Sequence, residues 1–436
     1  MLEYIHVHNF MCISDLKIDL SYKDKAPAGY KRASEIYFFE HRNKTKNRVS
    51  PVFAMYGANG SGKSTIINAI KCLKNILANG LKMRYYIPNR IIDNDKSLTY
   101  TELCIAFWKD SNRFKYSIKF NEDSIVKESL ILNNELIFNI SESQLLDVIN
   151  SDSDANSEFL KRCINAKTKK QIKTFLFIIP ETLPGFNKAL LEAKEYILQD
   201  LSVYSSNNEQ NYISGINKLA NTYQGTDENN QKDAISCIID YLGRLDIGII
   251  DISVNKSLLK DYFKNLKNKN LIDLNFHINK MAFNEDNENK DIYIYDTYTY
   301  HKTVSNNIVN FDINYESEGT KIVIGLLGEF LAAIRTGKVI LIDELDESLH
   351  SLLVKELVNL FKTKRINENG AQIIFTAHNP EILDILNPNE VGIVNYRKSK
   401  GSVVTKISEF GIKVKKGYLR DAYLKGTFGG IPFPYV

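Results

Sequence analysis

The chain has 436 residues, more than one hydrophobic core usually serves, so its length predicts a main domain with a substantial insertion or second lobe. Its 56 lysines and arginines against 52 aspartates and glutamates leave a formal net charge of +4, too small to indicate nucleic-acid binding from charge alone. Five scattered cysteines without a Cys-x-x-Cys pair fit neither a disulfide framework nor a zinc site. With no long apolar run and no signal-like beginning, we expect a cytoplasmic protein without a membrane partner.

The first elements of the chain are two strands. Residues 2–10 are rich in apolar and β-favouring types, and apolar residues alternate with polar ones from Leu16 to Leu20, which predicts an N-terminal hairpin. Residues 21–50 are charged and contain Pro27 and Gly29. They predict a surface excursion before the chain re-enters the core.

A glycine-rich motif follows at a strand-to-helix junction. Val52–Tyr56 reads as a buried strand, and helical spacing continues to about Asn79. Between them lies Gly-x-x-x-x-Gly-Lys-Ser, whose backbone amides and helix N-terminus bind phosphate. Lys63 would reach the β- and γ-phosphates, and the Ser64 hydroxyl would ligate Mg²⁺. A chance turn is the alternative, which both flanks disfavour. The predicted nucleotide-binding residues are Gly57, Asn59, Gly60, Gly62, Lys63, Ser64 and Thr65.

The middle of the chain changes its periodicity. Strand-like runs at 98–107, 114–120 and 125–132 predict a small antiparallel sheet. From 141 to 275 the spacing is helical and polar loops interrupt it, but no heptad pattern is sustained. We therefore expect a compact helical insertion over 141–275.

Strands resume at 292–295, 297–301 and 308–313, and a helix is predicted from Thr320 to Arg335. Ser317 and Gly319 precede this helix, where a hydroxyl, free amides and the helix dipole can bind an anion. By itself the pattern is weak evidence for an anion site and is more typical of a plain N-terminal cap formed by Ser317.

Two acids follow an aliphatic strand at residues 338–344. A buried parallel strand presents such carboxylates at its carboxyl end, where open α/β sheets bind ligands. Asp343 would hold the Mg²⁺ shell, and Glu344 would polarise the attacking water, so the pair predicts hydrolysis and disfavours a small-molecule kinase. The alternative is an acidic turn that caps the next helix.

The apolar run at 372–377 predicts a further strand, which ends at His378. This histidine could contact the γ-phosphate and report its loss. A lone histidine at a strand end is more often structural, and it is the order of the motifs that favours the functional interpretation.

The order of these motifs resembles the head of ABC-type ATPases. More narrowly, residues 342–350, 375–378 and 423–432 resemble the AAA-named, overcoming-lysogenization-defect-like ATPases of prokaryotic anti-phage defence operons, among them the ATPase subunits of PARIS-like two-gene systems. The resemblance covers roughly residues 1–140 and 290–436. Three features depart from it: Glu318 replaces the usual signature glycine, His350 replaces an aspartate, and no Q-loop glutamine follows the first helix.

This resemblance implies an α/β fold: a P-loop NTPase of ABC-ATPase head type, with a mixed central sheet, flanking helices, an antiparallel β-subdomain and a helical insertion. It divides the chain into residues 1–140, 141–275 and 276–436. It also implies an ATPase that uses ATP and Mg²⁺ and forms head-to-tail dimers or larger rings, in which Ser317 and Gly319 close over the nucleotide held by Lys63 of another subunit. A separately encoded effector, a Toprim-like nuclease or a toxin, would be its partner.

Three other classes stay open at this point. A DNA-repair-type ABC ATPase would bind duplex DNA through a basic C-terminal region. A solvated basic face or a docking surface for an acidic partner is the commoner explanation of such a region. A transporter subunit is disfavoured by the insertion and the signature, and a GTPase by the missing Asn-Lys-x-Asp motif, although adenine specificity itself is not visible. The basic residues are Arg397, Lys398, Lys400, Lys406, Lys413, Lys415, Lys416, Arg420 and Lys425, against Glu409 and Asp421.

Overall fold

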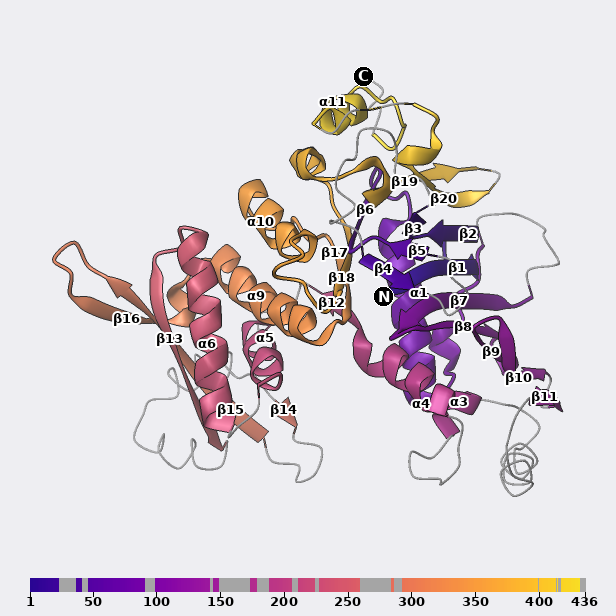
Figure 1. Ribbon diagram of the computed structural model, residues 1–436, viewed down its shortest axis with the longest axis horizontal. Helices are drawn as coiled ribbons and strands as arrows, with labels where there is room; N and C mark the ends of the chain where they lie inside the picture. Colours follow the sequence, from indigo (N-terminus) through magenta and orange to yellow (C-terminus); the bar gives the residue numbers. More distant parts are fainter. Residues whose placement is uncertain are drawn as a thin grey trace. The chain divides into compact units, whose positions relative to one another are not determined.

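The computed structural model describes residues 1–22, 37–40, 46–90, 99–141, 144–148, 173–178, 188–205, 211–223, 227–258, 284–285, 292–398, 400–412, 414 and 417–431. Two compact units divide the chain (Figure 1). The first comprises Met1–Ser205, Gly337–Asp346 and Val358–Val436, and the second comprises Ser206–Thr336 and Glu347–Leu357. No helix within the described ranges has the length and apolar character to cross a bilayer.

A mixed sheet forms the centre of the first unit, with the strand order β11-β10-β9-β8-β7-β1-β2-β20-β19-β6-β18-β17-β12. The fold class expected from the motifs is therefore confirmed. The strands are β1 (Leu2–Phe10), β2 (Ile13–Asp19), β6 (Val52–Tyr56), β7 (Thr101–Lys109), β8 (Asn112–Phe120), β9 (Ile125–Leu132), β10 (Glu135–Ser141), β11 (Gln144–Val148), β12 (Leu201–Ser205), β17 (Val339–Asp343), β18 (Gln372–Thr376), β19 (Val391–Arg397) and β20 (Gly401–Lys406). A separate small sheet contains β3 (Ser21–Tyr22), β4 (Tyr37–Glu40) and β5 (Lys46–Val49).

One half of the large sheet is parallel. The strands β12, β17, β18, β6 and β19 pair in parallel with one another, in that order. Every residue of β6 and β18 is buried, which is why both strands read as continuous apolar runs in the sequence. The carboxyl ends of β6, β17 and β18 consequently meet at one edge of the sheet, where the predicted catalytic motifs lie.

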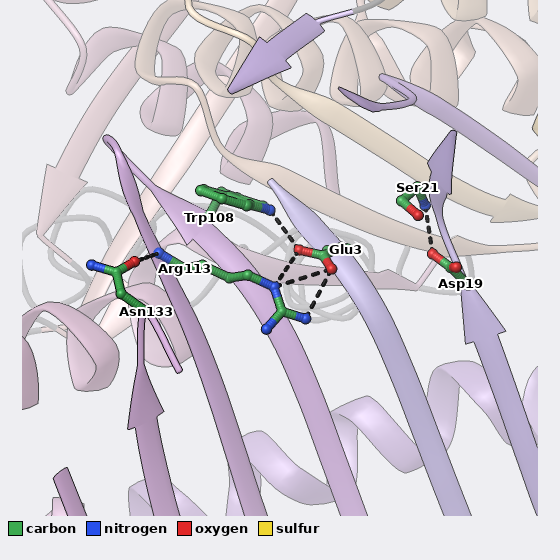
Figure 2. A network of polar contacts seen from close by, with 6 residues as sticks. All are labelled: Glu3, Asp19, Ser21, Trp108, Arg113 and Asn133. Carbon is green, nitrogen blue, oxygen red and sulfur yellow. Dashed lines mark hydrogen bonds and ion pairs between the residues drawn. The ribbon is translucent and has the colours of Figure 1, made fainter. Parts of the chain in front are cut away.

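The other half is antiparallel and begins with the expected hairpin, in which Tyr4 pairs with Asp19. Figure 2 shows a polar network that joins three strands of this half. The Glu3 carboxylate of β1 accepts hydrogen bonds from Trp108 Nε1 of β7 at 2.6 Å and from Arg113 Nε of β8 at 2.8 Å. Because Arg113 reaches across β7, this partly buried ion pair fixes the register of all three strands.

The P-loop helix α1 (Lys63–Asn79) ends where the sequence predicts and begins two residues before the helical spacing that starts at Thr65. It buries Ile66, Ile70, Leu73 and Leu77 in the core of the first unit. This spacing is that of one helical face. The remaining helical elements of this unit are η2 (Met83–Tyr85), α3 (Phe175–Ile178), α4 (Lys188–Glu195), the π-helix η3 (Tyr196–Asp200), η5 (Pro380–Ile385), η6 (Pro388–Glu390), η7 (Ile407–Glu409) and α11 (Leu419–Leu424). Helix α10 (Ser351–Lys362) is divided between the two units.

The second unit combines helices with an antiparallel sheet. Its elements are α5 (Asn211–Ala220), α6 (Asp227–Arg244), β13 (Ile249–Leu258), β14 (Asn284–Glu285), β15 (Ile292–Lys302), β16 (Ile308–Asp312), η4 (Ile313–Tyr315) and α9 (Glu318–Thr336). A Cβ atom added to Gly215 of α5 would lie 2.2 Å from the carbonyl oxygen of Gly325 in α9. The two helices therefore touch through their backbones, and only glycine fits at their crossing.

The middle of the chain is more varied than its helical spacing suggests. The described part of 141–275 carries the helices α3, α4, α5 and α6, but also the strands β11, β12 and β13. Strand β12 joins the large sheet by pairing with β17, a long-range contact that local periodicity does not reveal. Residues 142–143, 149–172, 179–187, 206–210, 224–226 and 259–275 of the predicted insertion lie outside the described residues. The two short strands expected at 292–301 are one strand, β15, because β13 pairs along it.

Candidate functional site

The glycine-rich loop turns at positions that favour glycine, for reasons that differ between Gly60 and Gly62. Gly62 is the N-terminal cap of α1 and has φ of 101°, in the left-handed region. A Cβ atom at Gly62 would lie 2.2 Å from Ser402 Oγ and 2.9 Å from Cys12 Sγ. Gly60 also has a positive φ, of 75°, but space is open around it. The loop therefore needs Gly62 for both conformation and space, and Gly60 for conformation alone.

Lys63, the first residue of α1, folds back over the loop. Its ammonium group donates to the carbonyl oxygens of Gly57 at 2.8 Å and Ala58 at 3.2 Å. An ammonium group has three donors, so one N–H is left for a ligand. Burial lowers the pKa of Lys63, while the carboxylates of Glu344, Asp343 and Asp346 oppose that shift. The Lys63 ammonium group is thus held beside the pocket by the carbonyl groups of the preceding loop.

The two acids after β17 are tied to the neighbouring strand β18 by one hydroxyl group. Thr376 Oγ1 donates to Asp343 Oδ1 at 2.6 Å and accepts from the backbone N–H of Glu344 at 2.7 Å. The Thr376 carbonyl also accepts from the N–H of Leu345. Glu344 has φ of 53°, a left-handed conformation that costs a non-glycine residue about 1–2 kcal/mol. The bonds to Thr376 hold it in that conformation.

His378 lies beside Glu344 at the end of β18. The distance between His378 Nε2 and Glu344 Oε1 is 3.6 Å, and each side chain is a little over two-fifths exposed. The backbone N–H groups of His378 and Asn379 both point at Asp346, whose Oδ2 accepts from them, at 2.8 Å for His378. Asp346 therefore anchors the backbone that carries His378.

These elements surround one pocket of about 410 Å³ in the first unit. It brings together the predicted P-loop residues with Glu344 and His378. The lining residues are Cys12, Asn59, Gly60, Ser61, Gly62, Lys63, Ser64, Thr65, Glu344 and His378. The predicted residues Gly57 and Asp343 lie directly behind this lining, through their contacts with Lys63 and Thr376.

The chemistry of the pocket fits a nucleoside triphosphate with Mg²⁺. The buried Ser61 hydroxyl has no hydrogen-bond partner among the described residues, and Lys63 keeps one free donor, so both can serve phosphate oxygens. Ser64 and Asp343 offer the hard oxygen ligands that Mg²⁺ prefers. In the described ranges no group of three or more His, Cys, Asp or Glu side chains is placed to hold a metal ion. Mg²⁺ at Ser64 and Asp343 would share its coordination with phosphate and water, its usual arrangement in such sites.

The predicted signature residues Ser317 and Gly319 belong to the second unit. The capping role expected for Ser317 is confirmed, because its Oγ accepts the backbone N–H of Thr320 at 3.1 Å in the first turn of α9. Glu316, which precedes it, accepts from Thr299 Oγ1 and lies 2.7 Å from His301 Nε2. Ser317 is exposed at the N-terminus of α9. Its bond to the Thr320 N–H and the contacts of the preceding residue, Glu316, hold it there.

Four residues around the pocket were not among the predicted site residues: Ser61, Thr376, Asp346 and Cys12. The position of Thr376 could have indicated its role, because it is a hydroxyl residue at the end of β18, the strand next to the one that ends in Asp343. This indication depends on knowing that β17 and β18 are neighbours. Cys12 contacts the P-loop through Thr65 Oγ1, at 3.2 Å from its Sγ. It arrives from the turn between β1 and β2, and nothing in the local sequence indicates this contact.

Comparison with known proteins identifies one family. The family described as "AAA domain, putative AbiEii toxin, Type IV TA system" matches residues 52–384. No curated protein matches the sequence. Among solved structures, "Crystal structure of the SmcHead bound to the C-winged helix domain of ScpA" is similar, with a TM-score of 0.44, 14% identity, 93% of this chain and 97% of that chain covered. "SMC head domain from Thermotoga maritima" has a TM-score of 0.41 and 12% identity, with 95% and 99% covered.

Proposed function

This chain belongs to the AAA-domain family that matches residues 52–384 and is an ATPase, and on that premise we propose that ATP acts in it as an assembly switch. ATP would be bound between subunits, and its hydrolysis would control a separately encoded effector, a Toprim-like nuclease or a toxin, in anti-phage defence. The observation that carries the proposal is the meeting of Lys63, Glu344 and His378 at one pocket.

The residues at the pocket have distinct tasks in hydrolysis. The P-loop amides and Lys63 bind the phosphates of the substrate ATP. Glu344 takes a proton from water as the water oxygen bonds to the γ-phosphorus and the bond to the bridging oxygen breaks, which leaves ADP and phosphate. His378, at 3.6 Å from Glu344, contacts the γ-phosphate and senses its loss. Mg²⁺ held by Ser64 and Asp343 would neutralise phosphate charge.

The second half of each nucleotide site would come from another subunit. Ser317 is exposed at the N-terminus of α9, and this end of a helix favours an anion such as the γ-phosphate. A ligand bound by two subunits at once favours the associated state. The free energy of ATP binding would therefore stabilise a dimer or larger ring. The range 141–275, which interrupts the catalytic motifs, is in this proposal the sensing or effector-docking surface.

Mixing two inactive variants tests the shared site. Lys63→Ala removes the loop cation, and Ser317→Arg obstructs the signature. If the site is shared, a mixture regains part of the parent ATPase activity, because some interfaces pair an intact P-loop with an intact signature. A mixture that co-assembles, as shown by two different affinity tags, but regains no activity refutes the shared site and leaves a self-contained ATPase.

A second candidate, direct binding of duplex DNA, is supported by exposed basic residues on β19 and the turn that follows it. Arg397, Lys398 and Lys400 are exposed and form no ion pair with the described residues. Two other basic residues of the predicted DNA-binding region are already engaged within the protein. Lys406 is buried and donates to the Ser21 carbonyl, and Arg420 pairs with Asp384. Lys413, Lys415 and Lys416 lie outside the described residues, and Lys425 is exposed.

The salt dependence of DNA binding separates this candidate from the first. Replacing Arg397, Lys398 and Lys400 by alanine should weaken duplex binding and reduce the slope of log affinity against log salt by about one per lost phosphate contact. An unchanged slope, or no binding by the parent, removes DNA as a direct partner of this surface.

A further inference from the structure

The glycine-rich segment near the C-terminus packs against the first glycine of the P-loop. Gly429 and Gly430 follow α11 and have φ of 71° and 72°. A Cβ atom at Gly430 would lie 2.6 Å from Ile393 Cγ2 and 3.5 Å from Gly57 Cα. The segment thus approaches the P-loop from outside the pocket, on the side where β19 lies. The last residue of the motif, Pro432, is outside the described residues.

Two tyrosines connect this segment to the core. The Tyr423 hydroxyl donates to the Gly430 carbonyl at 3.0 Å, which closes the segment on itself. The Tyr423 ring packs edge-on against the ring of Tyr56, with 5.5 Å between their centroids. Tyr56 is the last residue of β6 and directly precedes Gly57. The C-terminal segment and the P-loop strand therefore share one aromatic contact.

Tyr56 also reaches the loop that carries His378. Its hydroxyl donates to the Asn379 carbonyl at 2.9 Å, while the N–H groups of His378 and Asn379 bind Asp346. Burial, and after it the charge of Asp346, raise the pKa of Tyr56 well above its usual range. The hydroxyl consequently stays protonated and remains a donor. Asn379 is held on its N–H side by Asp346 and on its carbonyl side by Tyr56.

The position of the His378 ring depends on this backbone. Its side chain is 43% exposed, so packing around the imidazole does little to hold it. Its only ionic neighbour among the described residues is Glu344, at 3.6 Å. A shift of the 378–379 backbone would therefore be passed directly to the ring and change its distance from Glu344 and from a bound γ-phosphate.

We propose that Tyr56, supported by Tyr423 and the C-terminal glycine segment, is a positioning residue that sets His378 against the nucleotide pocket. This inference rests on the role proposed above for His378. It assigns a task to the C-terminal motif, which joins the P-loop strand to the phosphate-sensing loop from behind. Helix α11 supports the same loop, since Arg420 pairs with Asp384 of η5, the element that begins right after Asn379.

Tyr56→Phe tests the central bond, since it removes the hydroxyl and keeps the ring against Tyr423. We expect kcat for ATP to fall about tenfold, as for other residues that orient a catalytic group, with KM and nucleotide affinity changed less than about twofold. A purely structural tyrosine would lower the melting temperature without separating kcat from KM. Tyr418→Phe, at a 62% exposed position, is the matched control and should leave both constants unchanged.

A double-mutant cycle shows whether Tyr56 acts through His378. If it does, Tyr56→Phe has no further effect on kcat once His378 is alanine. Equal losses in the two backgrounds overturn the positioning role while leaving the proposed function intact. If His378→Ala keeps the parent kcat, the role proposed for His378 is refuted, and the inference about Tyr56 is refuted with it.

The contribution of the C-terminal segment is tested with a pair of glycines. Gly430→Ala forces a methyl group against Ile393, whereas Gly411→Ala carries the same backbone cost, with φ of 70°, and nothing within 4 Å of its Cβ. Only Gly430→Ala should lower kcat. If that variant does not fold, Tyr423→Phe, which loses only the bond to the Gly430 carbonyl, should give a smaller loss of kcat at unchanged KM. Parent-like kcat in Tyr423→Phe overturns the part of the inference that concerns this segment.

Discussion

The hydroxyl of Thr376 is predicted to hold both the proposed Mg²⁺ ligand Asp343 and the proposed catalytic base Glu344, and Thr376→Val removes it at nearly constant volume. Two hydrogen bonds are lost, one of 2.6 Å to the Asp343 carboxylate and one of 2.7 Å from the Glu344 N–H. A bond to a charged group contributes about 1.5–3 kcal/mol, and leaving the partly buried Glu344 N–H unpaired costs about 1 kcal/mol, the lower end of the range for a buried group. Glu344 also loses a bond that keeps it at a positive φ. We therefore expect stability to fall by about 3 kcal/mol.

The same change should appear in catalysis through Mg²⁺. Loss of a group that orients a metal ligand typically lowers metal affinity or activity by about 10–100-fold. The assay is steady-state ATP hydrolysis as a function of Mg²⁺ concentration, together with ATP binding in the presence of a chelator. The half-saturating Mg²⁺ concentration should rise and turnover should fall. Binding without Mg²⁺ should persist, because it depends on Lys63 and the loop.

Thr376→Ser is the matched control for this prediction. It keeps the hydroxyl and both hydrogen bonds and removes one buried methyl group, which costs about 1 kcal/mol. Its Mg²⁺ dependence should equal that of the parent. If the valine variant also keeps the parent Mg²⁺ dependence and turnover, the two bonds do not position the acids and the assignment of Thr376 is wrong.

Three further predictions concern the P-loop and Glu344. Lys63→Ala should abolish productive ATP binding, measured by nucleotide affinity and turnover, because the loop loses its side-chain cation; parent-like turnover would move the site elsewhere. Glu344→Gln should bind ATP but hydrolyse it slowly, so size-exclusion with ATP and Mg²⁺ should show a larger or longer-lived oligomer, and an unchanged oligomer and rate would count against its role. Gly62→Ala should lose about 1–3 kcal/mol more stability than Gly60→Ala by thermal unfolding, since only the former clashes with neighbouring atoms; equal losses would refute the steric argument.

Much of the site could be predicted because its chemistry is encoded in short local patterns. Buried parallel strands read as apolar runs, and residue types that such strands rarely contain lie at the ends of β6, β17 and β18 or within two residues of them: glycine, an acid pair and a histidine. The limits of α1 follow from its spacing and from Gly80, which ends it. Patterns of this kind extend over a few residues, so the sequence alone determines them.

What the sequence could not determine depends on which distant segments become neighbours. The pairing of β12 with β17, the contact of Cys12 with Thr65 and the packing of Tyr423 on Tyr56 all join residues far apart in the chain. No local preference specifies them, because each results from the way the whole sheet and its connections pack. The same holds for the positive φ of Glu344, which is stable only because Thr376 of the adjacent strand binds it. The sequence by itself determined the candidate catalytic groups, and the tertiary structure alone decided which residues hold them in place.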